Sequence, residues 1–358
     1  MDAMTTAPDV IAEKQGLAGR LRLNRPRALH SLNRQMVRDM ASALIEWRDD
    51  PGVRMILIDH TEGRGFCAGG DVVGISKDID GYEAAARNFF FDEYRLNHLE
   101  YTYPKPGVAF MDGITMGGGV GISLPCRYRV VTERTVLAMP ETAIGIFPDV
   151  GGGRYLSRLR GRLAQFLALT GARLDGAECL RLRLATHYLP SERLEEAKER
   201  IAAQPFRTQA VLDELSEENV PSAQLMDNLG RVDRYFAADR IEEVLNALDF
   251  GALGGDEWAA RQAATIRTKS PMACKVSLKL LVESPYHPHF VDEMRMEYGI
   301  MVRLIHHPDF KEGVRALLIE KDNKPSWHPT NPAVISDADV QQFFEPLPPE
   351  ERWRPFDL

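Results

Sequence analysis

The sequence predicts an α/β fold followed by a mostly helical region, and three observations lead to this prediction. In the first two hundred residues, short apolar segments alternate with amphipathic segments and glycine-rich turns, a pattern typical of α/β proteins. After Pro190 the chain becomes charged, rich in Ala, Leu and Glu, and helical in period. The length of 358 residues exceeds a typical domain of roughly 100–200 residues, so we expect one large domain with an addition, or two domains.

The strands and helices of the α/β part are expected in the following order along the chain. Gly16 to Leu23 is a short apolar strand, and Val53 to Asp59 is a second one. Between them, the segment from Ser31 to Trp47 has apolar residues at helical spacing. Further strands are expected at 106–111 and 128–132, which gives the alternation of strands and helices that predicts an α/β core.

The later part of the chain is expected to be helical. Amphipathic periodicity predicts helices near 191–203, 208–216, 239–248, 257–268, 272–283 and 289–306. The tail from Asn323 is rich in proline, and we expect it to run extended over the surface because proline cannot continue a helix.

Composition and charge disfavour several classes of protein. With 44% apolar and 27% charged residues, the chain is neither a collagen, a coiled-coil rod nor a disordered protein. The net charge of −8 disfavours a general nucleic-acid binder without excluding a small anionic ligand. The four cysteines are widely spaced, so we expect neither a disulfide framework nor a metal site.

The N-terminal segment carries no targeting signal that we can identify. Residues 1–9 lack the apolar core of a secretory signal and the arginine-rich character of a transit peptide. No apolar run approaches the roughly 20 residues that span a bilayer. We therefore expect a cytoplasmic protein without a membrane partner.

Two glycine-rich segments follow predicted strands and lead into predicted helices. They are Gly65 to Asp71 and Asp112 to Gly121. Glycine lets the backbone approach a ligand closely, and amides at a helix start carry partial positive charge. Two such turns facing each other would form a pair of donors for a carbonyl oxygen in acyl chemistry. Each turn alone is explained more simply as a tight loop, and neither matches a phosphate-binding loop.

A third segment, from Met139 to Gly153, places two carboxylates in an apolar run. Glu141 and Asp149 are surrounded by Ala, Ile, Phe and Val, which makes them candidates for raised pKa values and for acid, base or nucleophile roles. Helix capping explains each residue equally well, because Glu141 follows Pro140 in a first turn and Asp149 precedes a glycine-rich helix start.

Together with the segment 23–33, these three segments resemble the crotonase (enoyl-CoA hydratase/isomerase) superfamily in the same order. The resemblance implies a ββα spiral core, which we assign to residues 10–205, and a helical extension with a C-terminal helical region at 206–358. Within the superfamily the resemblance is greatest to the 3-hydroxyisobutyryl-CoA hydrolases. This narrower resemblance rests on the segments 93–97, 112–123, 139–153 and 309–327.

The resemblance implies an acyl-CoA thioester hydrolase that cleaves 3-hydroxyisobutyryl-CoA, or a similar short 3-hydroxyacyl-CoA, in valine catabolism. The amides of Gly70 and Gly118 would bind the carbonyl oxygen, Glu141 would be the reactive carboxylate, and Asp149 the second one. Glu93 matches a family residue near the substrate hydroxyl. The residues that would line the coenzyme A groove are Ala28, Leu29, Phe66, Cys67 and Ala68, and Gly117 is a further substrate-binding residue.

Coenzyme A is then part of the substrate, and we expect no separate cofactor, metal or nucleic-acid partner. The superfamily also implies a homo-oligomer, a trimer or a hexamer. Two mechanisms stay open for Glu141: direct attack, which gives a mixed anhydride, or activation of water as a general base.

Two other functions stay open as alternatives. The first is enoyl-CoA hydration or isomerisation. Hydratases of the family have a second Glu where this chain has Gly121, and a glycine where it has Asp149, but an isomerase needs only a residue such as Glu141. The second is a non-catalytic acyl-CoA binder, which the presence of both carboxylates and both glycine turns disfavours.

Overall fold

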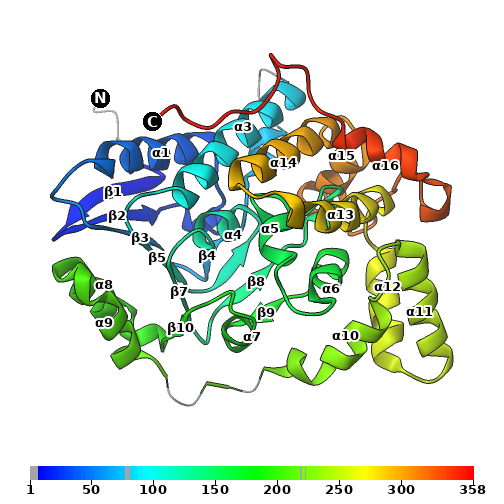
Figure 1. Cartoon of the computed structure of the whole chain (residues 1–358), viewed down its shortest axis with the longest axis horizontal. Coiled ribbons are helices and arrows are strands. Elements are labelled where there is room, and N and C mark those ends of the chain that lie inside the picture. The colour runs from blue at the N-terminus through cyan, green and yellow to red at the C-terminus, as the bar shows by residue number, and fades with distance from the viewer. Residues whose placement is uncertain (1–6, 77–80, 218–219, 222) are drawn as a thin grey trace. The chain divides into compact units, whose positions relative to one another are not determined.

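The computed structural model describes residues 7–76, 81–217, 220–221 and 223–358, and its tertiary contacts form two compact units (Figure 1). The first unit comprises the described residues within 1–70, 99–137 and 174–222, and the second those within 71–98, 138–173 and 223–358. Each unit is therefore assembled from three separate stretches of the chain. The domain boundary that the sequence analysis places after residue 205 stays a prediction.

The first unit contains a six-stranded sheet. Its order is β1 (Val10–Gln15), β2 (Ala18–Leu23), β3 (Met55–His60), β5 (Gly107–Met111), β7 (Tyr128–Val131) and β10 (His187–Tyr188). β1 and β2 form an antiparallel hairpin, and the neighbours from β2 to β10 are parallel. The four predicted strands are confirmed as β2, β3, β5 and β7. β1 was not predicted; its exposed central positions include the charged residues Glu13 and Lys14.

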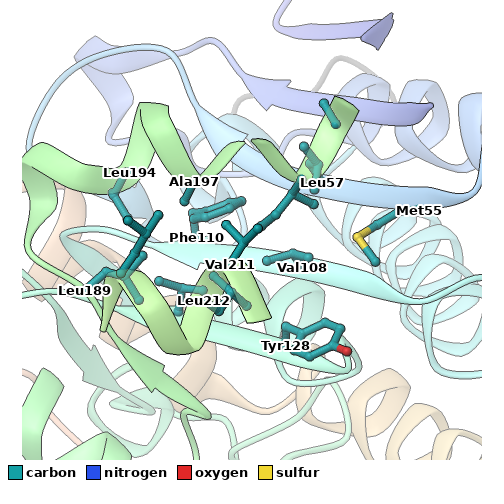
Figure 2. Packing of buried hydrophobic residues seen from close by; sticks show 14 of the residues in the cluster. Met55, Leu57, Val108, Phe110, Tyr128, Leu189, Leu194, Ala197, Val211 and Leu212 are labelled. Atoms are coloured by element: carbon teal, nitrogen blue, oxygen red, sulfur yellow. The ribbon is translucent and has the colours of Figure 1, made fainter. Parts of the chain in front are cut away.

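Two helices cover one face of this sheet and form the main core of the unit. α8 (Leu194–Ala203) and α9 (Thr208–Leu215) pack their apolar sides against β3, β5 and β7, as Figure 2 shows. Leu57, Phe110 and Leu212 are among the fully buried side chains of this cluster. The helices predicted at 191–203 and 208–216 are thus confirmed as α8 and α9, and both contribute buried side chains to the core beside the sheet.

A second, smaller sheet carries the glycine turns. Its order is β4 (Gly65–Cys67), β6 (Ile114–Met116), β8 (Val136–Ala138) and β9 (Leu174–Asp175). β4 is followed by α2 (Val72–Ile75), and β6 leads into α4 (Gly118–Ser123), as predicted. The helix predicted at 31–47 is α1 (Arg34–Arg48), which begins where the Asn33 side chain accepts a hydrogen bond from the Met36 amide. α7 (Gly176–Arg181) also belongs to the first unit, whereas the residues of α2 fall within the second.

The second unit is helical, and α13 (Pro271–Glu283) is buried along most of its length at its centre. It packs against α5 (Gly152–Leu156), α6 (Leu163–Thr170) and α16 (Asp337–Phe344). The predicted helices at 239–248, 257–268, 272–283 and 289–306 are confirmed as α11, α12, α13 and α14. The remaining bounds are α3 (Tyr82–Tyr101), α10 (Leu229–Tyr235), α11 (Ile241–Leu253), α12 (Glu257–Arg267), α14 (Phe290–Leu304) and α15 (Pro308–Val314).

The prediction of an extended tail from Asn323 is wrong for residues 337–344, which form α16. Ser336 and Asp339 make a capping box at its start: the Ser336 hydroxyl accepts from the Asp339 amide, and the Asp339 carboxylate accepts from the Ser336 amide. Val340 then buries its side chain. This local capping and burial outweigh the prolines, which lie outside the helix. No helix in the described part of the chain is long and apolar enough to cross a membrane.

Candidate active site

In the first unit, the two glycine turns lie against each other. Gly69 has φ +104°, and a Cβ built on it would lie 3.3 Å from the Met116 carbonyl oxygen and 3.7 Å from the Gly118 nitrogen. A Cβ on Gly119 would lie only 2.3 Å from the Cys67 carbonyl oxygen. Side chains at these positions would force the two turns apart, so the glycines allow the close approach that the sequence predicts. The predicted donors Gly70 and Gly118 belong to these adjoining turns.

The predicted groove residues lie around the same turns. The carbonyl oxygen of Leu29 accepts a hydrogen bond from the Ala68 amide (3.0 Å), which joins the loop after η1 (Pro26–Ala28) to the loop after β4. Leu29 has φ +50°, an unusual conformation for a residue other than glycine. The side chains of Phe66 and Cys67 are fully buried, so these two residues can face a ligand only through their backbone. The partly exposed residues are Ala28, Leu29, Ala68 and Gly117.

In the second unit, three carboxyl groups are buried close together. Glu93 comes from α3, Glu141 is the first residue of η2 (Glu141–Ile144), and Asp149 precedes α5; their exposed fractions are 2%, 5% and 4%. Burial raises the pKa of all three. Repulsion from Asp149 raises the pKa of Glu141 further, and both of these groups raise the pKa of Glu93. The three groups thus form one electrostatically coupled cluster.

Asp149 has a specific partner in this cluster. The Tyr94 hydroxyl donates a 2.8 Å hydrogen bond to Asp149 Oδ2, and both side chains are buried. Burial raises the pKa of Asp149 to about 7, and the hydrogen bonds from Tyr94 and from its own backbone oppose the rise. Asp149 therefore changes its charge near neutral pH, as a group that transfers protons requires. The site prediction missed Tyr94, because a tyrosine beside Glu93 carries no signal of its own.

The capping interpretation does not hold for Asp149. The N-cap of α5 is Gly151, which has no side chain to accept a hydrogen bond. The amides of Gly151 and Gly153 donate instead to Glu297 on α14, at 2.8 Å and 3.2 Å. Glu141 does occupy a first turn, as the capping interpretation requires, but its Oε2 has no hydrogen-bond partner among the described residues.

Several buried polar atoms near these acids have no partner within the part of the chain that the structure describes. They include Glu93 Oε1, Glu141 Oε2 and both amide atoms of Asn97, one helical turn after Glu93 on α3. A buried polar atom without a partner costs about 1–3 kcal/mol, so water or a ligand is expected to bond to these groups. Unsatisfied acids and an unsatisfied amide together indicate a site for a polar ligand. The sequence analysis did not single out Asn97.

Among the described residues, no group of three or more His, Cys, Asp or Glu side chains has an arrangement that could hold a metal ion. All four cysteines are buried, and none of them takes part in a disulfide bond. Burial raises the pKa of Cys126 and Cys179 above their usual range, so neither is a reactive thiolate at neutral pH.

The fold and the sequence together define the class of protein. The chain matches the enoyl-CoA hydratase/isomerase family over residues 18–344, and it belongs to this family. A solved structure described as a carnitinyl-CoA dehydratase from Mycobacterium thermoresistibile superposes with a TM-score of 0.89, at 38% identity over 96% of this chain and 98% of that one. The predicted crotonase fold, with a C-terminal helical region, is confirmed.

Several curated proteins with similar sequences are named 3-hydroxyisobutyryl-CoA hydrolases. The chain is 39% identical to the mitochondrial 3-hydroxyisobutyryl-CoA hydrolase of Gallus gallus, over 96% of this chain and 90% of that protein. It is 36% identical to 3-hydroxyisobutyryl-CoA hydrolase 1 of Arabidopsis thaliana, over 97% of this chain and 94% of that protein. The resemblance found in the sequence is confirmed by these relatives.

Proposed function

We propose that the protein hydrolyses the thioester of 3-hydroxyisobutyryl-CoA, or of a similar short 3-hydroxyacyl-CoA, to the free acid and coenzyme A. The observation that carries the proposal is the cluster of Glu93, Glu141 and Asp149, buried together with unsatisfied oxygens. A pure binding site has no need for coupled carboxyl groups in an apolar setting. Relatives of 36% and 39% identity that are named for this hydrolysis support the proposal.

In the proposed reaction, the amides of Gly70 and Gly118 donate hydrogen bonds to the thioester oxygen and make the carbonyl carbon electrophilic. Removal of one donor of this kind costs about 10²–10³ in rate. Glu141 then either attacks the carbonyl carbon or takes a proton from an attacking water. Direct attack breaks the carbon–sulfur bond, releases the coenzyme A thiolate and leaves an acyl anhydride on Glu141, which water cleaves to the free acid.

Asp149 is the proposed proton-transfer group. A carboxyl group with a pKa of about 7 exists in both forms near neutral pH, so it can protonate the leaving thiolate and recover its proton. Binding of the substrate 3-hydroxyl is the other role open to it. Burial raises the pKa of Glu93 well above the usual range, which favours its protonated form, and a protonated carboxyl group can both donate to and accept from that hydroxyl.

Dehydration or hydration of an acyl-CoA is the second candidate function. One observation favours it: Glu93, Glu141 and Asp149 supply more than one carboxyl group, as a hydratase site with two glutamates requires. Position 121 in α4, where hydratases of the family have their second Glu, is a glycine in this chain. The name of the M. thermoresistibile structure points the same way for that protein. We place the hydrolysis first because Asp149 and its partner Tyr94 provide a group that titrates near neutrality.

The assignment to valine breakdown belongs to this proposal. The cytoplasmic location stays a prediction, since the name of the G. gallus relative places that protein in mitochondria. The predicted trimer or hexamer also stays a prediction.

A panel of short acyl-CoA thioesters tests the function. Release of free thiol is measured with 3-hydroxyisobutyryl-CoA, 3-hydroxypropionyl-CoA and isobutyryl-CoA, and absorbance change is measured with crotonyl-CoA. We expect rapid thiol release from the hydroxyacyl thioesters and at least about 10²-fold slower release from isobutyryl-CoA, because it leaves the buried carboxyl groups without a partner. Crotonyl-CoA hydration without thiol release would establish the alternative. Tight binding without any turnover would establish a non-catalytic binder.

A further inference from the structure

The turn that carries Asp149 has a strained backbone. Val150 has φ +54° and Gly151 has φ +87°, so two consecutive residues adopt the left-handed conformation. For a β-branched residue such as Val150 this conformation is a true outlier, which costs roughly 1–3 kcal/mol and persists only where the surroundings impose it. The Val150 side chain is buried, so the turn cannot relax by rotating it into solvent. Some contact must therefore hold this turn in place.

The contact comes from Glu297, which lies far away in sequence. Glu297 is fully buried on α14, and its two carboxyl oxygens accept from Gly151 and Gly153 on the C-terminal side of Val150. The turn is pressed against the same helix. A Cβ on Gly151 would lie 2.8 Å from Phe290 Cε2, and one on Gly153 would lie 2.4 Å from Glu293 Oε1. Both glycines are thus needed for the approach of the turn to α14.

We infer that Glu297 is the positioning residue for Asp149: by holding the amides of Gly151 and Gly153, it fixes the left-handed turn that directs the Asp149 carboxyl group to the Tyr94 hydroxyl. The inference deepens the proposed function and rests on it for the catalytic role of Asp149. Glu297 itself touches no reacting atom in this scheme. It acts through the backbone of the turn.

The free-energy cost of burying a carboxyl group at position 297 supports the inference. Burial raises the pKa of Glu297 well above its usual range, and repulsion from Glu293 and Asp149 adds to the rise; the two amides oppose it. Helix starts are ordinarily capped by a nearby Ser, Thr, Asp or Asn at little cost. Here the local cap is a glycine, and a buried acid from α14 takes its place. The titratable groups that face Glu297 are Glu293, Asp149 and Tyr94.

The neighbouring acid on the same helix offers a matched control. Glu293 is also fully buried, one turn before Glu297, but it pairs with the Ser284 hydroxyl (2.6 Å) and with His287 Nδ1 (2.9 Å) rather than with the amides of the turn. Replacing Glu293 with glutamine disturbs the same region of the core without releasing the hydrogen bonds from Gly151 and Gly153 to Glu297.

The test compares Glu297→Gln with Glu293→Gln in the full chain. The glutamine oxygen can accept a hydrogen bond from one of the two amides, but its NH₂ group is a donor and cannot accept from the other. The turn should therefore loosen, and the hydrogen bond from Tyr94 to Asp149 should weaken. We expect kcat for 3-hydroxyisobutyryl-CoA to fall about 10- to 100-fold in Glu297→Gln with little change in KM, since misplacement of about 1 Å costs up to 10²-fold. The apparent pKa of Asp149 should rise, and Glu293→Gln should keep the kcat and pH profile of the wild type.

The added variant Glu297→Gln/Val150→Gly should recover part of the lost kcat, because glycine adopts the left-handed conformation without strain. An unchanged kcat and pH profile in Glu297→Gln, or an equal loss in Glu293→Gln, would overturn the inference. A downward shift of the Asp149 pKa would also overturn it, because it would show that Glu297 acts through its charge. If Glu297→Gln does not fold, Glu297→Asp is measured in its place with the same expectations.

A readout without turnover separates this inference from the proposed function. The Asp149 carboxyl group is titrated by ¹³C NMR in labelled wild-type and Glu297→Gln protein, with Asp149→Asn to assign the resonance. If the wild type releases no thiol, the proposed function fails, and the inference is still decided by whether the Asp149 titration moves upward. If the wild type is active and the titration does not move, only the inference fails.

Discussion

The hydroxyl of Tyr94 donates a 2.8 Å hydrogen bond to the buried carboxyl group of Asp149, across 55 residues of sequence. Two opposing effects meet in this pair. Burial favours the neutral acid, whereas the tyrosine hydroxyl stabilises the carboxylate, and the result is a pKa of about 7 for Asp149. The pair therefore makes the charge of the site sensitive to pH in the neutral range, where neither residue alone would ordinarily titrate.

Replacing Tyr94 with phenylalanine should move the pH dependence of the reaction upward. Loss of the hydroxyl removes a donor that stabilises the carboxylate, so the pKa of Asp149 rises above about 7. The limb of the kcat/KM profile that reports Asp149 should shift to higher pH in Tyr94→Phe. Tyr286→Phe, which changes an exposed tyrosine, serves as the control and should leave the profile in place. An identical profile in Tyr94→Phe would remove Asp149 from the titrating position.

The same pKa predicts how Asp149 affects stability. Its folded-state pKa of about 7 lies above the ordinary value of 3.8, so the folded protein binds a proton that the unfolded chain has already lost between these pH values. Stability contributed by this group is present below about pH 4 and is lost as the pH rises through about 7. The unfolding free energy, measured with urea at pH 5 and at pH 8, should fall less between these two pH values in Asp149→Asn than in the wild type. An equal loss in both proteins would contradict the raised pKa.

Local sequence patterns were sufficient for most of the fold. The strands β2, β3, β5 and β7 are apolar runs, and α11 to α14 have clear amphipathic periodicity. β1 was not predicted because, as an edge strand, it exposes charged residues along its middle and therefore does not form an apolar run. α16 was not predicted because its capping box follows a proline-rich stretch, and the prolines led to the prediction of an extended tail.

For the candidate site, too, some residues could be predicted from local sequence patterns and others could not. Glycine turns and carboxylates are visible in sequence because each is a short segment with an unusual composition. The partners of Asp149 are not visible in this way. Tyr94 lies 55 residues before it, and Glu297 lies 146 residues after Gly151, so only the tertiary fold brings these side chains to the turn. Asn97 resembles any other polar helix residue until its burial is known.

Gly119→Ala should disrupt the glycine turns. Its Cβ would lie 2.3 Å from the Cys67 carbonyl oxygen, a backbone atom that cannot move aside cheaply. We expect lower thioesterase activity together with a lower melting temperature, measured by thermal unfolding. Gly230→Ala in α10 is the control, because its Cβ would meet no atom within 4 Å; it should raise the unfolding free energy by up to about 1 kcal/mol through helix propensity. Wild-type activity in Gly119→Ala would argue against the close approach of the turns.

Asp59→Ala should strongly destabilise the first unit. Asp59 is buried in β3 between Arg20 (2.5 Å) and Lys198 (2.7 Å), so its removal leaves these two buried cations to share the exposed carboxylate of Glu195. Breaking a buried ion pair from one side costs about 3–5 kcal/mol, which urea unfolding would detect. Glu196→Ala removes an exposed acid paired with Arg193 and Arg200, and it should cost at most about 1 kcal/mol. Similar losses in the two variants would show that the buried network contributes little.

Glu141→Gln should separate the chemistry of the site from its folding. The two side chains have the same shape, and Glu141 Oε2 has no hydrogen-bond partner among the described residues, so the melting temperature should stay near that of the wild type. The amide can neither attack the thioester nor accept a proton from water, and thiol release should fall by at least about 10²-fold. Near wild-type hydrolysis would exclude Glu141 from the reacting position. In the wild type, a single turnover in ¹⁸O-labelled water tests for the anhydride, because label enters the Glu141 carboxyl group only if water cleaves an anhydride at the Glu141 carbonyl carbon.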